Sequence, residues 1–226
     1  TLFSIQSNAS HFVGGEITWQ CDTDPLSADY GKYTFYLTIY QDCDGIDFDA
    51  SYDITVHNHP SLSSINLPLV STNDISPSGV AGSVPCYNCG NQPFGQFGAV
   101  KQWNYVSAPI TIVGTPPFNG WHFTWGSCCR SGAIVNIPNA ASEDWTVRSV
   151  MYPYIDPSGT IFPNNNMCHD NSPIFKEEPK SILCTGYPFS YSHLAFDVEL
   201  DSLSYSWAEP LDDNVSYNPT NPSATA

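Results

Sequence analysis

The first part of the chain alternates apolar and polar residues, as strands with one buried face do. Residues 33–40 are rich in β-branched and aromatic side chains, and residues 17–21 alternate in the same way. Turn formers fill residues 22–32 between them, so we expect an antiparallel hairpin. Residues 52–56 also alternate and predict a third strand.

Short strand-like segments recur along the rest of the chain. Residues 60–93 are rich in Ser, Asn, Pro and Gly without a sustained period, and we expect loops there. The further predicted strands are residues 99–105, 109–113, 121–125, 133–137, 145–152, 179–183, 187–191 and 203–207. No helix start is followed by a 3.6-residue pattern. The pattern therefore predicts an all-β, sandwich-like or barrel fold.

Changes in composition divide the chain into three predicted parts. Residues 1–10 are an N-terminal arm or a signal-peptide remnant, in which Ser7 and Ala9 hold the small-residue positions of a cleavage site. Residues 11–170 are an N-terminal β domain that ends near an Asn run at 164–166. Residues 171–226 are too few for a complete sandwich, so we expect a partial Ig-like or cadherin-like module and a longer natural protein.

The charge balance narrows the classes of partner. The chain has 22 Asp and Glu but only 6 Lys and Arg, a formal net charge of -16. Phosphate backbones and anionic membrane surfaces need clustered cations, so neither is an expected partner. No apolar run is long enough to span a membrane. Acidity instead suits calcium and cationic or neutral partners.

An even set of cysteines in a chain without helix signals predicts disulfides and an oxidising, extracellular compartment. The eight cysteines are Cys21, Cys43, Cys86, Cys89, Cys128, Cys129, Cys168 and Cys184. A zinc site is the weaker alternative, because an adjacent pair is poor tetrahedral spacing. Neighbouring cysteines strain a bond between themselves, so we expect Cys128 and Cys129 to reach different partners, with Cys43, Cys86 and Cys89 as candidates.

Three carboxylates at alternate positions, Asp197, Glu199 and Asp201, lie just before a strand-like stretch. Calcium takes several oxygen ligands from short acidic segments, so this spacing predicts a calcium site. The alternative is that the three acids lie on a solvated strand edge, since acidic triples arise by chance in so acidic a chain.

A second acidic loop contains Asp42, Asp44, Asp47 and Asp49 around Gly45. The carboxylate density suits calcium, but the spacing departs from the EF-hand pattern. The alternative is an ordinary acidic loop held by Cys43.

Candidate binding and catalytic residues are few. The loop that carries Phe118 and Trp121 is the best candidate for an exposed aromatic surface that stacks on sugars, although aromatics at strand positions are more often core. His57 and His59 share a strand face, which suits a transition metal, but no third ligand is identifiable. No G-x-S-x-G elbow or marked carboxylate pair occurs, so we expect no enzyme activity.

Several stretches together resemble one family. They are residues 11–21, 33–43, 127–130, 172–175 and 197–207, in that order. They are similar to the N-terminal region of large Bacteroidetes surface proteins that carry gliding-motility-associated C-terminal domains. The last of them is similar to cadherin-like and PKD-like repeats with a D-x-D-G-D calcium turn, but Glu199 replaces the middle Asp and Leu200 the Gly.

The resemblance implies a non-enzymatic cell-surface adhesin or filament protein, exported by type nine secretion, that mediates attachment or gliding. Its partners would be a surface polysaccharide or other cell-surface ligand and the secretion and gliding machinery. Two alternatives remain: a carbohydrate-binding module, and a filament subunit that assembles by strand addition.

Overall fold

The computed structural model describes residues 12–76, 87–93, 98–131, 134–163, 168, 170–177, 188, 190–212 and 217–221. Predictions for residues 1–10, for Cys86 and Cys184, for the Asn run and for the strand 179–183 lie outside these residues, as does part of the predicted strand 187–191.

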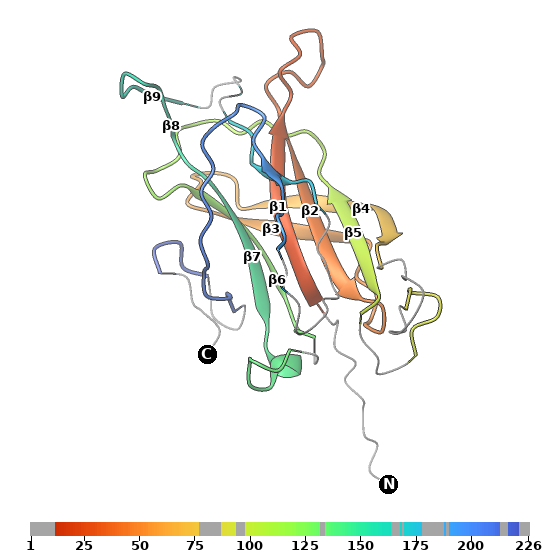
Figure 1. Cartoon of the computed structure of the whole chain (residues 1–226). Coiled ribbons are helices and arrows are strands. Elements are labelled where there is room, and N and C mark those ends of the chain that lie inside the picture. The colour runs from red at the N-terminus through yellow and green to blue at the C-terminus, as the bar shows by residue number, and fades with distance from the viewer. Residues whose placement is uncertain are drawn as a thin grey trace.

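Seven strands form one antiparallel sheet that curls almost into a barrel (Figure 1). The strands are β1 (Phe12–Cys21), β2 (Tyr33–Asp42), β3 (Ser51–His57), β4 (Ser64–Asp74), β5 (Val100–Val106), β6 (Trp121–Ser127) and β7 (Trp145–Met151). Their order is β1-β2-β5-β4-β3-β6-β7. The two outer strands approach each other at Gly15, where a Cβ would lie 3.6 Å from Cγ1 of Val147. The predicted all-β, sandwich-like fold is confirmed.

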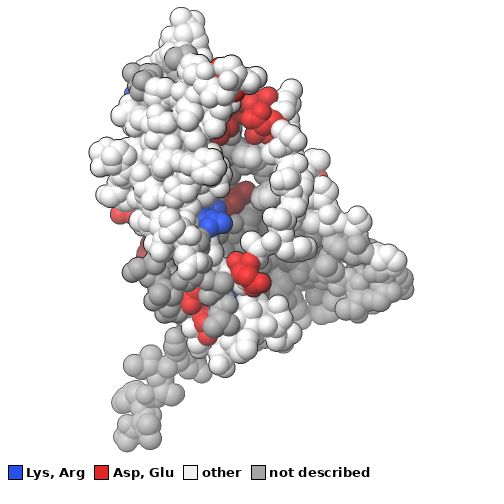
Figure 2. Space-filling view, turned by 90° about the vertical axis from the view of Figure 1, so that its left-hand side faces the viewer, with Lys and Arg blue, Asp and Glu red and all other residues white. Residues whose placement is uncertain are grey.

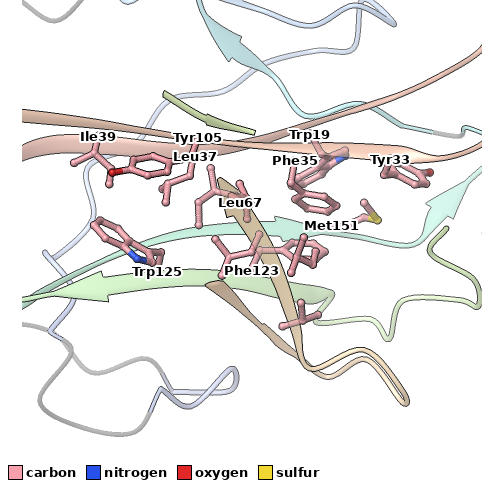
Figure 3. Packing of buried hydrophobic residues seen from close by; sticks show 14 of the residues in the cluster. Trp19, Tyr33, Phe35, Leu37, Ile39, Leu67, Tyr105, Phe123, Trp125 and Met151 are labelled. Atoms are coloured by element: carbon pink, nitrogen blue, oxygen red, sulfur yellow. The ribbon is translucent and has the colours of Figure 1, made fainter. Parts of the chain in front are cut away.

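The β1–β2 hairpin forms as its alternation predicts, with Ile17 opposite Leu37. The inward residues of both strands are buried, and they face β6 across a core of aromatic rings (Figure 3). The rings of Phe35 and Phe123 lie 4.7 Å apart, and those of Trp19 and Phe123 lie 5.6 Å apart. Removal of these large side chains from water stabilises the barrel.

Strand β4 lies where loops were expected, so that prediction was wrong. Ile65 and Leu67 alternate and are buried, but Pro68 argues against a strand. Leu69 donates its N–H to the carbonyl of Ala50 beside β3. Because successive residues of a strand point their N–H groups to opposite edges, the nitrogen of Pro68 faces away from β3. The missing N–H of the proline therefore costs no hydrogen bond with β3. Pairing with β5 begins only at Leu69, after that point. β4 thus pairs first with β3 and then with β5 and joins the two halves of the sheet.

Other strand predictions also need correction. Residues 109–113 make only a single bridge, from Ile110 to Tyr33. The described residues of 133–137 form no strand, and a short 3-10 helix, η1 (Ala140–Ser142), follows them. Residues 203–207 pair with no described strand, because strand formation needs a partner edge and alternation alone does not supply one. Two short features were not predicted: the hairpin of β8 (Tyr154–Ile155) with β9 (Ile161–Phe162), and the pair of β10 (Ile174–Phe175) with β11 (Ala195–Phe196).

Three disulfides join the described cysteines: Cys21–Cys168, Cys43–Cys89 and Cys128–Cys129. The expectation that the adjacent cysteines reach separate partners was wrong. Two of the candidate partners, Cys43 and Cys89, are bonded to each other, and the sulfurs of Cys128 and Cys129 are bonded within their own turn. Such bonds are typical of secreted or extracellular proteins. Among the described residues, no helix has the length and apolar character needed to cross a bilayer.

Two segments from the C-terminal part cover the outer strands. Asn171 Oδ1 accepts the N–H of Cys21 at 2.6 Å, and Ser172 Oγ accepts that of Trp19 at 2.8 Å, so both lie along the edge of β1. Leu211 O accepts the N–H of Thr146 on the edge of β7 at 3.1 Å. These contacts satisfy backbone groups that a strand edge would otherwise leave open. The division of the chain at residue 170 stays a prediction.

The turn before β6 gives a test of the packing. Gly120 has a φ of 81°, and a Cβ there would overlap Cγ1 of Val150. We expect Gly120→Ala to lower the free energy of unfolding by about 2 to 4 kcal/mol, through backbone strain and overpacking together. Gly159 is the matched control, since its φ is 85° but no atom lies within 4 Å of the Cβ position. Gly159→Ala should lower the free energy of unfolding by only about 1 kcal/mol. Denaturant unfolding measures the stability of both variants. Equal losses of stability in the two would contradict the close packing of Gly120 against Val150.

Candidate metal centre

The candidate centre lies at one end of the β10–β11 pair. Ile174 is opposite Phe196 in this antiparallel pair, so the residues that precede β10 and those that follow β11 meet at the same end. The first group includes Asp170, which lies two residues after the disulfide of Cys168 with β1. The second begins with Asp197. The pairing therefore brings together two segments that are distant in sequence.

Three carboxylates converge there, from Asp170, Asp197 and Asp201. One oxygen from each lies within 4.8 Å of the other two. The side chain of Asp197 is only 5% exposed, and its Oδ1 accepts the N–H of Asp201 at 3.1 Å. Leu200 turns the chain back with a φ of 65°. We call this group of three residues the acidic centre.

Glu199 lies beside the acidic centre and not in it. Its Oε1 accepts a hydrogen bond from Nδ2 of Asn171, whose own Oδ1 binds the N–H of Cys21 on β1. The predicted triple is therefore brought together only in part: Asp197 and Asp201 converge, and Glu199 connects the loop to the barrel through Asn171. Asp170 takes the third place.

Sequence reasoning missed Asp170 because ligand spacing is a local signal and this residue lies far from Asp197 in the chain. The one available hint was its position in a polar Asp-Asn-Ser run close to Cys168. A cysteine that bonds a distant strand carries its neighbours with it. That bond was not assignable from the sequence, because eight cysteines allow 105 pairings.

The electrostatics of the acidic centre are those of an unbalanced negative charge. Burial raises the pKa of Asp170 to about 7, and repulsion from Glu199, Asp197 and Asp201 adds to the effect. Within the described part of the chain, the ion pairs are Lys32–Asp29 and Lys101–Asp47, both elsewhere. Of the three predicted acids, Asp197 is buried, whereas Glu199 and Asp201 are exposed.

The arrangement fits a hard divalent cation. Oxygens bound to one calcium ion at 2.3 to 2.6 Å lie no more than about 5 Å apart. The three carboxylates of the acidic centre meet that limit. Asp170, Asp197 and Asp201 would be the ligands, and further oxygens would come from backbone carbonyls or water.

The second predicted calcium loop consists of Asp42, Asp44, Asp47 and Asp49. These four carboxylates do not form one cluster. Asp42 is buried and accepts Nε2 of Gln92 at 2.6 Å and the N–H of Gly98 at 3.1 Å, while Asp47 pairs with Lys101 at 2.9 Å. The backbone N–H groups of Asp44 and Asp49 bind the Asp42 carboxylate and the Tyr52 hydroxyl. The loop matches the alternative, an acidic loop held in place at Cys43 by its bond to Cys89.

The predicted aromatic surface is only half correct. Phe118 is 91% exposed at the tip of its turn, as expected. Trp121 is 1% exposed, so its proposed role in ligand binding was wrong. It is the first residue of β6, its ring packs 4.5 Å from that of His59, and it belongs to the core.

His57 and His59 do not share a metal site. His59 Nδ1 accepts the N–H groups of Ser61 and Leu62 and shapes the turn after β3. His57 Nε2 instead lies 2.8 Å from the hydroxyl of Thr124 on β6. The two histidines thus have separate structural roles.

A histidine cluster that the sequence did not reveal lies on the outer face of β3, β6 and β7. His122 Nε2 lies 2.7 Å from the carbonyl of Asn119, which can only accept, so Nε2 carries the proton. Nδ1 then accepts the hydroxyl of Tyr217 at 2.6 Å. The ring of Tyr217 also packs 4.7 Å from that of His57, and Arg148 donates to its hydroxyl at 3.5 Å. The cluster holds the C-terminal segment on the barrel.

Comparison with protein-family models, with curated proteins and with solved structures found no match. The function therefore has to be argued from the residues of this chain.

The histidine cluster predicts a loss of stability in acid. Burial lowers the pKa of both His57 and His122. For His122 the hydrogen bond with the Asn119 carbonyl opposes this shift, and the Arg148 charge adds to it. As the pH falls, the histidines of the unfolded chain are protonated at a higher pH than those of the folded protein. Their contribution to the free energy of unfolding is therefore complete above about pH 6.5 and is lost as the pH falls through the lowered pKa values of the folded protein. Protonated Nδ1 of His122 would also lose its bond from Tyr217.

Urea unfolding between about pH 7.5 and pH 5 tests this expectation. Over that range the free energy of unfolding of the wild type should fall by about 1 kcal/mol more than that of His122→Gln. Equal slopes for the wild type and His122→Gln would contradict the assignment.

Proposed function

We propose that the chain is a non-enzymatic extracellular attachment protein, part of a cell-surface adhesin or filament, in which calcium at the acidic centre fixes the C-terminal segment to a rigid barrel. The observation that carries the proposal is the convergence of Asp170 with Asp197 and Asp201 within 4.8 Å. A cation bound by both segments would tie together parts of the chain that are otherwise joined by the short β10–β11 pair and by the hydrogen bond between Asn171 and Glu199.

The covalent bonds support a mechanical role. The two cysteines of the Cys21–Cys168 disulfide are 147 residues apart in sequence, and closing a loop of that size lowers the chain entropy of the unfolded state by about 5 kcal/mol in free energy. It also anchors the segment that carries Asp170 directly to β1. A pull on the segment that follows β11 would therefore pass through the acidic centre and the disulfide into the sheet.

The proposed partners follow from the charge and from the resemblance. With a net charge of -16, the chain suits neutral or cationic partners at a cell surface, such as a surface polysaccharide or another surface protein. As a proposed relative of Bacteroidetes surface proteins, the chain would be exported and would act in attachment through a gliding machinery. The resemblance of residues 11–21, 127–130 and 197–207 supports this.

Calcium should change the melting temperature in a manner that depends on the acidic centre. In excess chelator, Asp201→Asn should melt at or slightly above the wild-type temperature, because one repelling charge is removed. With calcium the order should reverse, since the wild type gains stability from the bound ion and the variant gains less. We expect a wild-type shift of several degrees, which corresponds to about 1 to 3 kcal/mol.

Asp53→Asn is the matched control for this crossover, because Asp53 lies on the exposed face of β3, where its carboxylate accepts a hydrogen bond from Asn66. Its calcium response should equal that of the wild type. Differential scanning calorimetry measures all three proteins. A wild-type melting curve that is the same in calcium and in chelator would refute the calcium proposal.

A second candidate function, a filament subunit that assembles by strand addition, is favoured by residues 203–207. Leu203, Tyr205 and Trp207 alternate as in a strand, yet they pair with no described strand, and Trp207 is fully exposed. The first half of β4 pairs with β3 on one side before the β5 ladder begins, so its other edge can accept a strand as far as Pro68, which has no N–H to donate. A groove of about 380 Å³, lined partly by Pro68 and Ile110, lies beside this edge.

Sedimentation velocity over a rising concentration series tests assembly. The wild type should form oligomers, and the double variant Tyr205→Ser with Trp207→Ser should stay monomeric, because it lacks the apolar face of the added strand. Leu26→Ser removes an equally exposed apolar side chain from a turn and should not change assembly. A wild type that is monomeric at every concentration would exclude strand addition.

A further inference from the structure

A groove of about 260 Å³ runs between the start of β1 and the β10–β11 pair. Its floor is formed by Gly14 and Gly15, which leave the backbone of β1 uncovered. A Cβ at Gly14 would meet one neighbouring atom of the described residues within 4 Å, Cδ2 of Tyr40 at 3.8 Å, so the groove is open above this glycine. The groove thus has a flat floor beside a strand and walls that come from two other parts of the fold.

Two carboxylates, from Glu16 and Glu177, line this groove. Glu16 is half-buried, burial raises its pKa, and no ion pair or hydrogen bond joins its carboxylate to another described residue. Arg148 lines an adjoining groove that Glu16 also borders, but its guanidinium is directed to Tyr217. A half-buried carboxylate without a cation favours a ligand that brings one.

Aromatic rings form the walls. The ring of Phe175 on β10 lies 5.0 Å from that of His193, and His193 in turn packs edge-on against Tyr191 at 4.8 Å. On the other side stands Tyr40 of β2, which is the register partner of Gly14. Aromatic faces next to carboxylates attract ammonium and guanidinium groups, and they also pack against the aliphatic stems of Lys and Arg.

We propose that this groove binds a Lys or Arg side chain of an extended segment in a protein partner, with its charge between Glu16 and Glu177 and its stem against Phe175 and Tyr40. A neutral sugar fits less well, because the two carboxylates would gain no positive charge from it. The acidic surface of the chain favours the approach of a basic partner, and acidic side chains recur over the face in Figure 2. The inference rests on the proposed attachment function and names its partner chemistry, but it does not require calcium.

The probe is a capped Gly-Gly-Lys-Gly-Gly peptide, compared with the same peptide carrying an acetylated lysine. Titration into the isotopically labelled full chain should shift the backbone amide signals of Gly14 and Gly15 with the lysine peptide and not with the acetylated one. Glu16→Gln should weaken binding about five- to tenfold. Glu177→Gln, at an exposed position that folding tolerates, should weaken it as well. Glu209→Gln removes the same charge from an exposed position elsewhere and should leave affinity within about twofold.

Three results would overturn the inference. If Glu209→Gln weakens binding as much as Glu16→Gln, the attraction is that of net charge alone. If the acetylated peptide binds equally well, the groove takes neutral ligands, and a sugar becomes the better candidate. If neither peptide shifts the two glycine signals, the groove is not a binding site. Because Glu16 does not belong to the acidic centre, a failed calcium response with intact peptide binding would refute the calcium proposal alone.

Discussion

The attachment of residues 168–172 to the edge of β1 is the interaction on which the rest of the molecule depends. The disulfide between Cys21 and Cys168 and the side chains of Asn171 and Ser172 hold this segment against the strand. The same contacts satisfy backbone N–H groups that the edge strand would otherwise expose. They also fix where Asp170 stands and where β10 begins. The acidic centre and the groove above Gly14 both follow from this one attachment.

An acidic chain has to accommodate its carboxylates, and this structure does so in three ways. Asp42 is buried but surrounded by N–H donors, and it organises a loop. Asp47 pairs with Lys101 at the surface, where an ion pair contributes at most about 1 kcal/mol. The acidic centre and Glu16 have neither a full set of donors nor a protein cation among the described residues. Both proposed binding sites occur where the chain leaves negative charge without a partner.

The two sites share the β10–β11 pair, which is short and joined to the barrel mainly through its flanks. Phe175 and His193 form one wall of the groove, and Asp197 follows β11 directly. An ion at the acidic centre would therefore also order a wall of the groove, although the groove residues themselves bind no ion. Such coupling suits an attachment protein, because a stiffer wall loses less entropy when a partner docks. The barrel supplies the rigid part of both sites.

Local alternation in the sequence was enough to predict the β1–β2 hairpin, the all-β class and the aromatic core, because the two-residue period of a strand is written in neighbouring residues. It also placed Asp197 and Asp201 in one turn. It failed at β4, where a proline is harmless only because the strand changes partners there, and at Trp121, whose burial depends on which way β6 faces. The tertiary structure alone decided that Asp170 completes the acidic centre, that Glu199 turns to Asn171, and that Cys128 bonds Cys129. The first two outcomes depend on contacts between segments that are far apart in the chain, and no local pattern encodes such distances. The third depends on them indirectly, because the candidate partners Cys43 and Cys89 are bonded to each other.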